Sequence, residues 1–551
     1  MIGFVLVIAI AVGGYRYYKT WEARRLVKRA EVYLGWGDAR SAALTAQRAF
    51  QLDGSNSAAC RVLAQIAERE GLGSAAIEWR QRVLSIVPNS VADRIELART
   101  AVAFEQIEIA EAALNRVKPG AENLPRYHEV AGHIALAKQD IRTAEKQFAE
   151  AARLDPSNQS DRLNLAVLQL QSSSAEVRDQ AHAVLEKLLN DKSLRVRAAR
   201  ALRDYASRRA NASELLQVSE VLNGFPEATF QDRISYVQVL QVLGRPDFPG
   251  KLAELQNEAT NDPGKLSALI SWMANNHLAV FAIAWVKQLP NEIISNKAIR
   301  LAIADCYVTA NDPAGLTQWC GKADWGNLEY LRRAYLGWAA RVRGDDLTFQ
   351  SEWNNALRAA GSKGQELFTL EQTAARWRWK EETENLLWQL TRDPDKQKAA
   401  LTVLNQVYLE QGDTAQLYRV VSRLAEIRPD DPQVQNNLAS LALLLNVDTE
   451  MANAIAERLY KSDPKNAVFA STYGFALYRR GKYQQAVAVM NQLNPSDLEQ
   501  PAVAAYYAVF QLALGNKAKA AEYLGRSSGA NLLPQEKALV EQARKAVGQQ
   551  K

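Results

Sequence analysis

The chain has 551 residues, of which 48% are hydrophobic and 23% charged, and this composition excludes wholesale disorder. The net charge of +6 is concentrated at the start, because residues 1–29 hold six basic side chains and one acidic side chain, which leaves about +1 for the rest. A nearly neutral body argues against a nucleic-acid-binding groove. The three cysteines form no CxxC pair and no disulfide framework.

The first segment in chain order is apolar. Ile2 to Gly14 contains no charge, and three tyrosines extend the run to about 17 residues, so we expect a transmembrane anchor over residues 1–20. A basic collar follows to residue 29 and places the body on the cytoplasmic side by the positive-inside bias. A cleaved signal peptide is the alternative, but no Lys or Arg precedes the apolar run. A start codon upstream of this chain would allow the reversed topology.

Small residues then recur every 34 residues. One series is Ala30, Ala64, Ala98 and Gly132, and a second is Ala42, Ala76, Ala110 and Ala144. Two helices approach closely only where side chains are small, so this period predicts stacked helical hairpins. The pattern resembles the tetratricopeptide repeat (TPR) family, which implies an all-α, right-handed solenoid that binds other proteins.

After the anchor, the chain divides into four predicted parts that differ in how closely they follow the 34-residue repeat. We expect an N-terminal TPR array at residues 22–190, degenerate Trp-rich helical repeats at 191–397, a C-terminal TPR array at 398–531, and a capping helix with a tail at 532–551. Strand-like alternation is hard to find anywhere, which favours an all-α chain.

The sequence offers little sign of catalysis. His128 and His133 stand five residues apart in HEVAGH, one residue too many for the HExxH zinc motif, and would point about 140° apart on a helix. Neither a GxxxxGK[ST] loop nor a GxGxxG motif after a strand occurs. We therefore predict a protein that is not an enzyme and that uses no metal, cofactor or small-molecule substrate.

Candidate partner-binding residues come from the TPR resemblance and from the aromatic residues. In TPR proteins, positions 2, 5, 9 and 12 of each first helix line the concave face. Transferred to this chain, they include Arg61, Gln65, Arg99, Arg126, Glu129, His133, Asn437, Phe475 and Tyr478. Trp377 and Trp379 in RWRWK are added as the tryptophans expected to be exposed, since Trp and Arg dominate binding hot spots. The alternative for the Trp-rich region is a structural role in the core.

These features predict a membrane-anchored TPR scaffold that captures a protein partner, as a peptide or helix, for an envelope complex. The layout resembles the lipopolysaccharide assembly protein B family, without that family's C-terminal rubredoxin-like CxxC knuckle. One alternative is a periplasmic or secreted TPR scaffold of a polysaccharide-export or pilus-assembly system. An RNA-binding solenoid is the alternative of another class, and it requires a continuous basic stripe.

Overall fold

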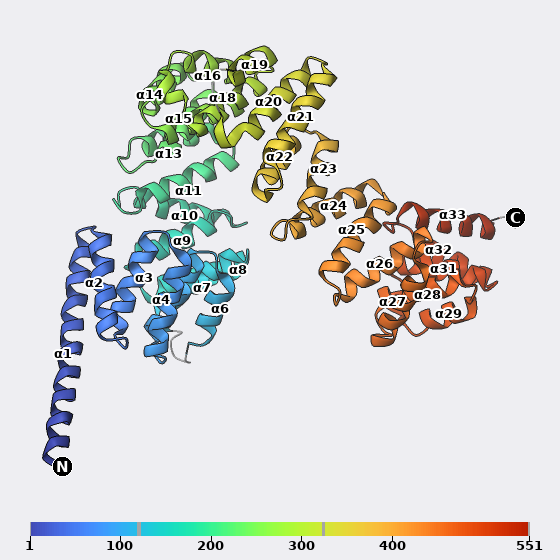
Figure 1. Cartoon of the computed structure of the whole chain (residues 1–551), viewed down its shortest axis with the longest axis horizontal. Helices are drawn as coiled ribbons and strands as arrows, with labels where there is room; N and C mark the ends of the chain where they lie inside the picture. Colours follow the sequence, from blue (N-terminus) through green and yellow to red (C-terminus); the bar gives the residue numbers. More distant parts are fainter. Residues whose placement is uncertain (1, 118–122, 322–324, 549–551) are drawn as a thin grey trace. The chain divides into compact units, whose positions relative to one another are not determined.

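The computed structural model describes residues 2–117, 123–321 and 325–548, with the backbone alone at residues 2–16. Every regular element within these ranges is a helix (Figure 1). The chain forms two compact units, Met1–Leu269 and Ile270–Lys551. Each unit stacks antiparallel helical hairpins in chain order, which confirms the predicted all-α repeat architecture.

Consecutive helices of the first unit pair into hairpins, and each hairpin packs on the next. The pairs are α1 (Ile2–Gly35) with α2 (Ala39–Leu52), α3 (Ser57–Arg69) with α4 (Gly73–Ile86), α5 (Val91–Ala103) with α6 (Ile107–Asn115), α7 (Pro125–Ala137) with α8 (Ile141–Leu154), α9 (Gln159–Gln169) with α10 (Ala175–Leu188), α11 (Arg195–Arg208) with α12 (Ala212–Asn223), and α13 (Phe230–Val242) with α14 (Phe248–Ala259). The helix α15 (Pro263–Asn275) follows, and the first unit ends within it, at Leu269.

The predicted small positions are the points where these helices touch. All seven alanines of the two series have 0% exposure: Ala30, Ala42, Ala64, Ala76, Ala98, Ala110 and Ala144. Gly132 replaces alanine where the partner helix carries Phe148, because a Cβ at Gly132 would lie 2.8 Å from the phenyl ring. The repeat period therefore records close helix contact, as the TPR-type pattern predicts.

The turn inside each hairpin also repeats. A residue with positive φ ends the first helix at Gly37, Gly71, Glu105 and Gln139, which are 34 residues apart. Glycine enters this left-handed region without a steric cost, whereas Glu105 and Gln139 adopt it at φ values of 60° and 62°. The stacking of helices on both sides holds the turn even where the residue is not glycine.

The first helix continues from the predicted anchor into the first repeat. Ala23, Val27 and Ala30, spaced by a helical turn, are buried in the core of that repeat. Among the side chains that the structure describes, no helix is both long and apolar enough to cross a bilayer. Residues 1–16, most of the predicted anchor, lie outside those described side chains.

The second unit contains more irregular hairpins. Its helices are α16 (Ala279–Val286), α17 (Asn291–Ile294), α18 (Lys297–Thr309), α19 (Pro313–Gly321), η2 (Gly326–Leu328), α20 (Glu329–Val342), α21 (Asp346–Ala360), α22 (Gly364–Arg376), α23 (Lys380–Leu390), α24 (Gln397–Gln411), α25 (Thr414–Ile427), α26 (Pro432–Leu445), α27 (Thr449–Ser462), α28 (Ala467–Arg479), α29 (Tyr483–Met490), α30 (Pro495–Leu498), α31 (Pro501–Ala513), α32 (Lys517–Arg526) and α33 (Pro534–Gly548).

The last helix, α33, also contacts helices that are distant from it in the chain. It packs on α31 and α32, its immediate neighbours, and also on α26 (Figure 1). Its Glu536 carboxylate accepts a hydrogen bond from the Tyr506 hydroxyl at 2.5 Å, and Gln535 Oε1 accepts one from the Thr414 hydroxyl at 2.5 Å. Thus α33 ties the end of the second unit to helices that precede it by about three hairpins.

Candidate functional site

The first helices α3, α5 and α7 form one surface of the first unit, here called the first-helix face, and ion pairs join them. Arg61 on α3 donates from Nε to Asp93 Oδ1 on α5 at 2.6 Å and from Nη2 to Oδ2 at 2.7 Å. The hydroxyl of Ser90, the residue capping α5, donates to the same Oδ2 at 2.6 Å. The Arg61 guanidinium holds the pKa of Asp93 below its ordinary value.

A second network joins these helices about two turns further along. The Arg80 side chain is nearly buried and donates from Nη2 to Glu68 Oε1 at 2.9 Å. Arg99 donates from Nη2 to Glu68 at 2.9 Å and from Nε to Glu96 at 2.9 Å. Burial opposes ionisation of Glu68, but the bonds from Thr100, Arg99 and Arg80 prevail and hold its pKa below the ordinary value. The two guanidiniums are therefore fixed in place before any ligand arrives.

A groove of about 440 Å³ opens beside this network. Three of the sequence-predicted residues, Gln65, Arg99 and Arg126, come together in its wall, and the other lining residues are Glu68, Arg69, Arg80 and Glu96. Arg126 bonds to Glu96 at 2.7 Å, yet its side chain is 58% exposed. The groove thus offers held guanidinium donors beside carboxylate acceptors, an arrangement that can bind polar or charged groups.

The two histidines of the HEVAGH segment, His128 and His133, contact different side chains. The Nδ1 atom of His128 lies 2.7 Å from Gln147 Oε1, whereas the His133 ring packs edge-on against Phe148 at 5.1 Å. Burial lowers the pKa of His133, and the charge of Glu129 opposes that effect. Within residues 2–117, 123–321 and 325–548, no group of three side chains is placed to hold a metal ion. His133 and Glu129 remain predicted partner-binding residues.

The predicted tryptophan pair differs from the expectation of exposure. Trp379 is only 8% exposed, because its ring packs edge-on against Phe349 at 5.2 Å and Trp353 at 5.5 Å. Trp377 is half-buried, and its ring centroid lies 5.5 Å from that of Tyr335. The two rings also touch each other, with centroids 4.8 Å apart. RWRWK supplies core contacts between hairpins, so Trp379 has no surface with which to bind a partner.

The predicted residues of the C-terminal array are divided between surface and core. Asn437 is exposed on α26 and accepts a hydrogen bond from Gln433 at 3.1 Å. Phe475 is 2% exposed and lies beneath Tyr506, whose hydroxyl bonds to α33. Tyr478 is half-buried between Phe475 and Phe510. The aromatic residues at these positions build the core, which removes Phe475 from the surface available to a partner.

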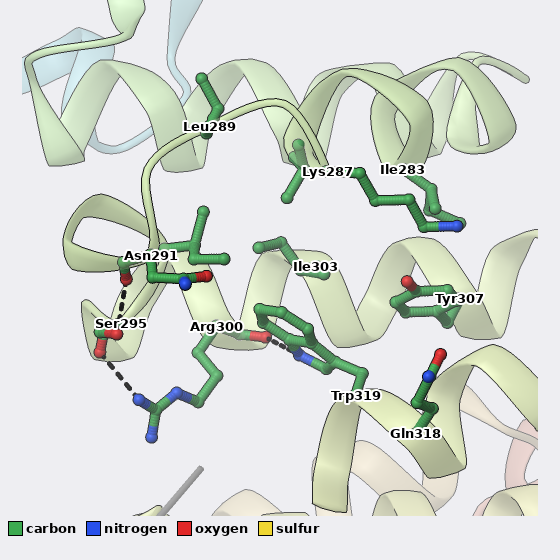
Figure 2. Close-up of a pocket in the computed structure, with 12 residues that line it drawn as sticks. Ile283, Lys287, Leu289, Asn291, Ser295, Arg300, Ile303, Tyr307, Gln318 and Trp319 are labelled. Carbon is green, nitrogen blue, oxygen red and sulfur yellow. Dashed lines mark hydrogen bonds between the residues drawn. The ribbon is translucent and has the colours of Figure 1, made fainter. Parts of the chain in front are cut away.

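A second cavity of about 560 Å³ lies among α16 to α19 (Figure 2). It opens where α16 has only 8 residues and the four-residue α17 follows. Trp319 Nε1 donates to the Arg300 carbonyl at 3.3 Å, and Arg300 Nη2 donates to the Ser295 carbonyl at 3.0 Å. Lys287 and Arg300 supply the charges of a mixed wall, in which Asn291, Ser295 and Gln318 add polar groups beside aliphatic side chains. The two cations and the polar groups could bind a polar or anionic group.

Several residues of the first-helix face were not predicted. Asp93 and Glu96 lie at repeat positions that are not in the transferred set, and Arg80 belongs to a second helix. A signal for them does exist, because Arg61 and Asp93 stand 32 residues apart and so do Arg200 and Asp232. Both pairs can be recognised in the sequence as opposite charges 32 residues apart, which is two residues fewer than the 34-residue repeat.

No family model and no curated protein matches the sequence. Three similar solved structures are the APC/C hetero-tetramer Cut9–Hcn1 (14% identity, 96% of this chain and 98% of that chain, TM-score 0.30), PilF of Pseudomonas aeruginosa (13%, 44% and 95%, 0.28) and PilW, a type IV pilus biogenesis factor (16%, 43% and 92%, 0.27). With TM-scores this low, the assignment of the fold rests on this chain's own hairpins, buried alanines and turns.

Proposed function

We propose that this chain is a scaffold that binds a protein partner on the first-helix face of its first unit. The observation that carries the proposal is the groove beside Arg99 and Arg126, where guanidiniums held by Glu68 and Glu96 stay partly open to solvent. Side chains already held in place lose little conformational entropy on binding, so they favour capture of a polar peptide or helix. The groove contains no nucleophile paired with a base, which favours binding over catalysis.

A site-specific crosslinking experiment tests this function. A photoreactive amino acid at Gln65, which is exposed in the groove wall, should give a discrete protein adduct in cells, whereas the same probe at Glu78, exposed on α4, should not. Arg126→Glu should weaken the adduct about tenfold, because it places a negative charge beside Glu96. Arg153→Glu is the matched control, since Arg153 is an exposed arginine paired with Glu150 on the second helix of the same hairpin. Equal adducts in both variants would contradict the proposal.

Residues 1–20 are proposed to tether the scaffold to a membrane, with the basic collar and the body on the cytoplasmic side. The apolar run supports this, as does its continuation as one helix, α1, into the first repeat, because a continuous helix leaves no flexible linker between the two. This layout is the one that the resemblance to the lipopolysaccharide assembly protein B family implies.

Removal of residues 1–20 tests the tether. The shortened chain should move from the membrane fraction to the soluble fraction, while its circular dichroism stays helical, because the first repeat begins at Ala23. The control is the full chain with Arg24 and Arg25 changed to Gln, which should still sediment with membranes. A shortened chain that sediments as before would refute the tether. The RNA-binding alternative is less favoured, since most arginines of the first-helix face are already paired with carboxylates.

A further inference from the structure

Three aspartates occupy the same place in three repeats of the first unit. Asp93, Asp161 and Asp232 are each the third residue of a first helix, in α5, α9 and α13. The side chain of the capping residue donates to Oδ2 in each case: Ser90 at 2.6 Å, Asn158 at 2.7 Å and Thr229 at 2.7 Å. The cap thus holds Oδ2 of each aspartate, which leaves Oδ1 to accept a hydrogen bond from another donor.

Two of these aspartates receive an arginine from that preceding repeat. Arg61 and Arg200 each stand 32 residues before their aspartate. Arg61 Nε donates to Asp93 Oδ1 at 2.6 Å, and Arg200 Nε donates to Asp232 Oδ1 at 2.8 Å. The Nη2 atoms bond to Oδ2 at 2.7 and 2.6 Å. The bidentate pair is thus a repeated element of this solenoid.

The third aspartate has a carboxylate where the others have a guanidinium. The residue 32 positions before Asp161 is Glu129. Asp161 is fully buried, and within the described part of the chain its Oδ1 has no hydrogen-bond partner. Burial and then the charges of Glu129 and Asp155 raise the pKa of Asp161 to about 6. A buried carboxylate oxygen without a donor is costly, so this repeat interface is incomplete as it stands.

We propose that the interface between Glu129 and Asp161 binds the guanidinium group of an arginine that the protein partner supplies. This inference rests on the proposed function and specifies one side chain of the partner. The incoming guanidinium takes the place that Arg61 and Arg200 have in their repeats, donating from Nε to Oδ1 and from Nη to Oδ2 of Asp161. Asp161 is fully buried, so the guanidinium reaches Oδ1 after side chains around it move, and the carboxylate of the half-exposed Glu129, whose charge already acts on Asp161, joins the pair.

An arginine fits this position better than other cations. The two filled interfaces use a planar, two-point contact, which an ammonium group cannot reproduce. A metal ion would need further ligands, and the described residues hold no group of three metal-ligating side chains. Glu129 also belongs to the face that carries the groove, since it follows Arg126 by one turn on α7. One partner segment can therefore reach both.

Hydrogen exchange of the full chain with small probes tests this proposal. N-acetyl-arginine amide at about 50 mM and constant ionic strength should slow exchange in α7 and α9 at least about twofold, whereas its neutral analogue N-acetyl-citrulline amide should not. Glu129→Arg should supply the missing guanidinium within the chain. That variant should show the slow exchange without any probe and should lose the response to the arginine probe.

Two further variants keep the test decisive. Asp161→Asn should abolish the response to the arginine probe, and Glu145→Arg, the same change of charge on α8, should leave it intact. The proposal is overturned if arginine and citrulline act equally on the wild-type chain, or if the arginine response survives both Glu129→Arg and Asp161→Asn. These results do not depend on the crosslinking at Gln65, so either conclusion can fail while the other stands.

Discussion

Phe148→Ala is expected to lower the free energy of unfolding of the α7–α9 region by about 3–5 kcal/mol. The Phe148 side chain is fully buried and fills the space that Gly132 leaves, with its ring 5.1 Å from that of His133. Removing the ring leaves a cavity, because the backbone of α7 already lies against α8 and cannot move much closer. Urea unfolding followed by hydrogen exchange in α7, α8 and α9 measures the effect where it arises, since each repeat depends mainly on its neighbours.

Phe281→Ala is the matched control for this loss. Phe281 is 66% exposed, so the same change should alter stability by no more than about 0.5 kcal/mol. Phe148→Leu should fall between the two, because leucine refills part of the space. Equal losses in Phe148→Ala and Phe281→Ala would show that the contact between Gly132 and Phe148 does not organise this hairpin.

Asp161→Asn is expected to raise the free energy of unfolding at neutral pH by on the order of 2 kcal/mol. Burial, then the charge of Glu129, then that of Asp155 raise the pKa of Asp161 to about 6 in the folded chain, against about 3.9 for an unfolded aspartate. The folded state therefore keeps this proton between about pH 4 and pH 6, where the unfolded state has lost it. Stability falls as the pH rises through that window, and the loss is complete above it.

The dependence on pH separates this effect from a change in packing. Asparagine does not ionise, so the stability of Asp161→Asn should exceed that of the wild-type chain at pH 7.5 and approach it at pH 4. Thermal unfolding at a series of pH values measures the difference. Asp93→Asn is the control of opposite sign, because Arg61 holds the pKa of Asp93 low and the substitution breaks an ion pair. A gain for Asp161→Asn that is equally large at pH 4 would refute the assigned ionisation.

The repeat architecture could be predicted because its signal is local and periodic. Close approach of two helices requires a small residue, so Ala64 or Ala98 is informative without knowledge of anything distant. The turn residues follow the same logic, since Gly37 and Gly71 stand where the backbone needs a positive φ. The polar groove was partly predictable as well, because Gln65, Arg99 and Arg126 occupy positions that recur in every first helix.

The remaining residues of the candidate sites depend on contacts that a single repeat does not contain. Phe475 and Trp379 are covered by other hairpins, because Tyr506 of α31 packs on the first, and Phe349 and Trp353 of α21 pack on the second. Asp161 is a similar case, because in the sequence it looks like another aspartate held by a helix cap until the residue 32 positions before it is compared with those before Asp93 and Asp232.

The sequence by itself thus determined the helices, their pairing into hairpins and the face on which the polar residues gather, since small residues, caps and turns act over a few residues. Only the tertiary structure decided which of those residues remain accessible. Burial and ion pairing are set by the neighbouring repeat about 32 residues away, and in the second unit by α33 acting on Thr414 over 121 residues. For that reason Arg126 is open to a partner, Phe475 is not, and Asp161 lacks the arginine that its equivalents possess.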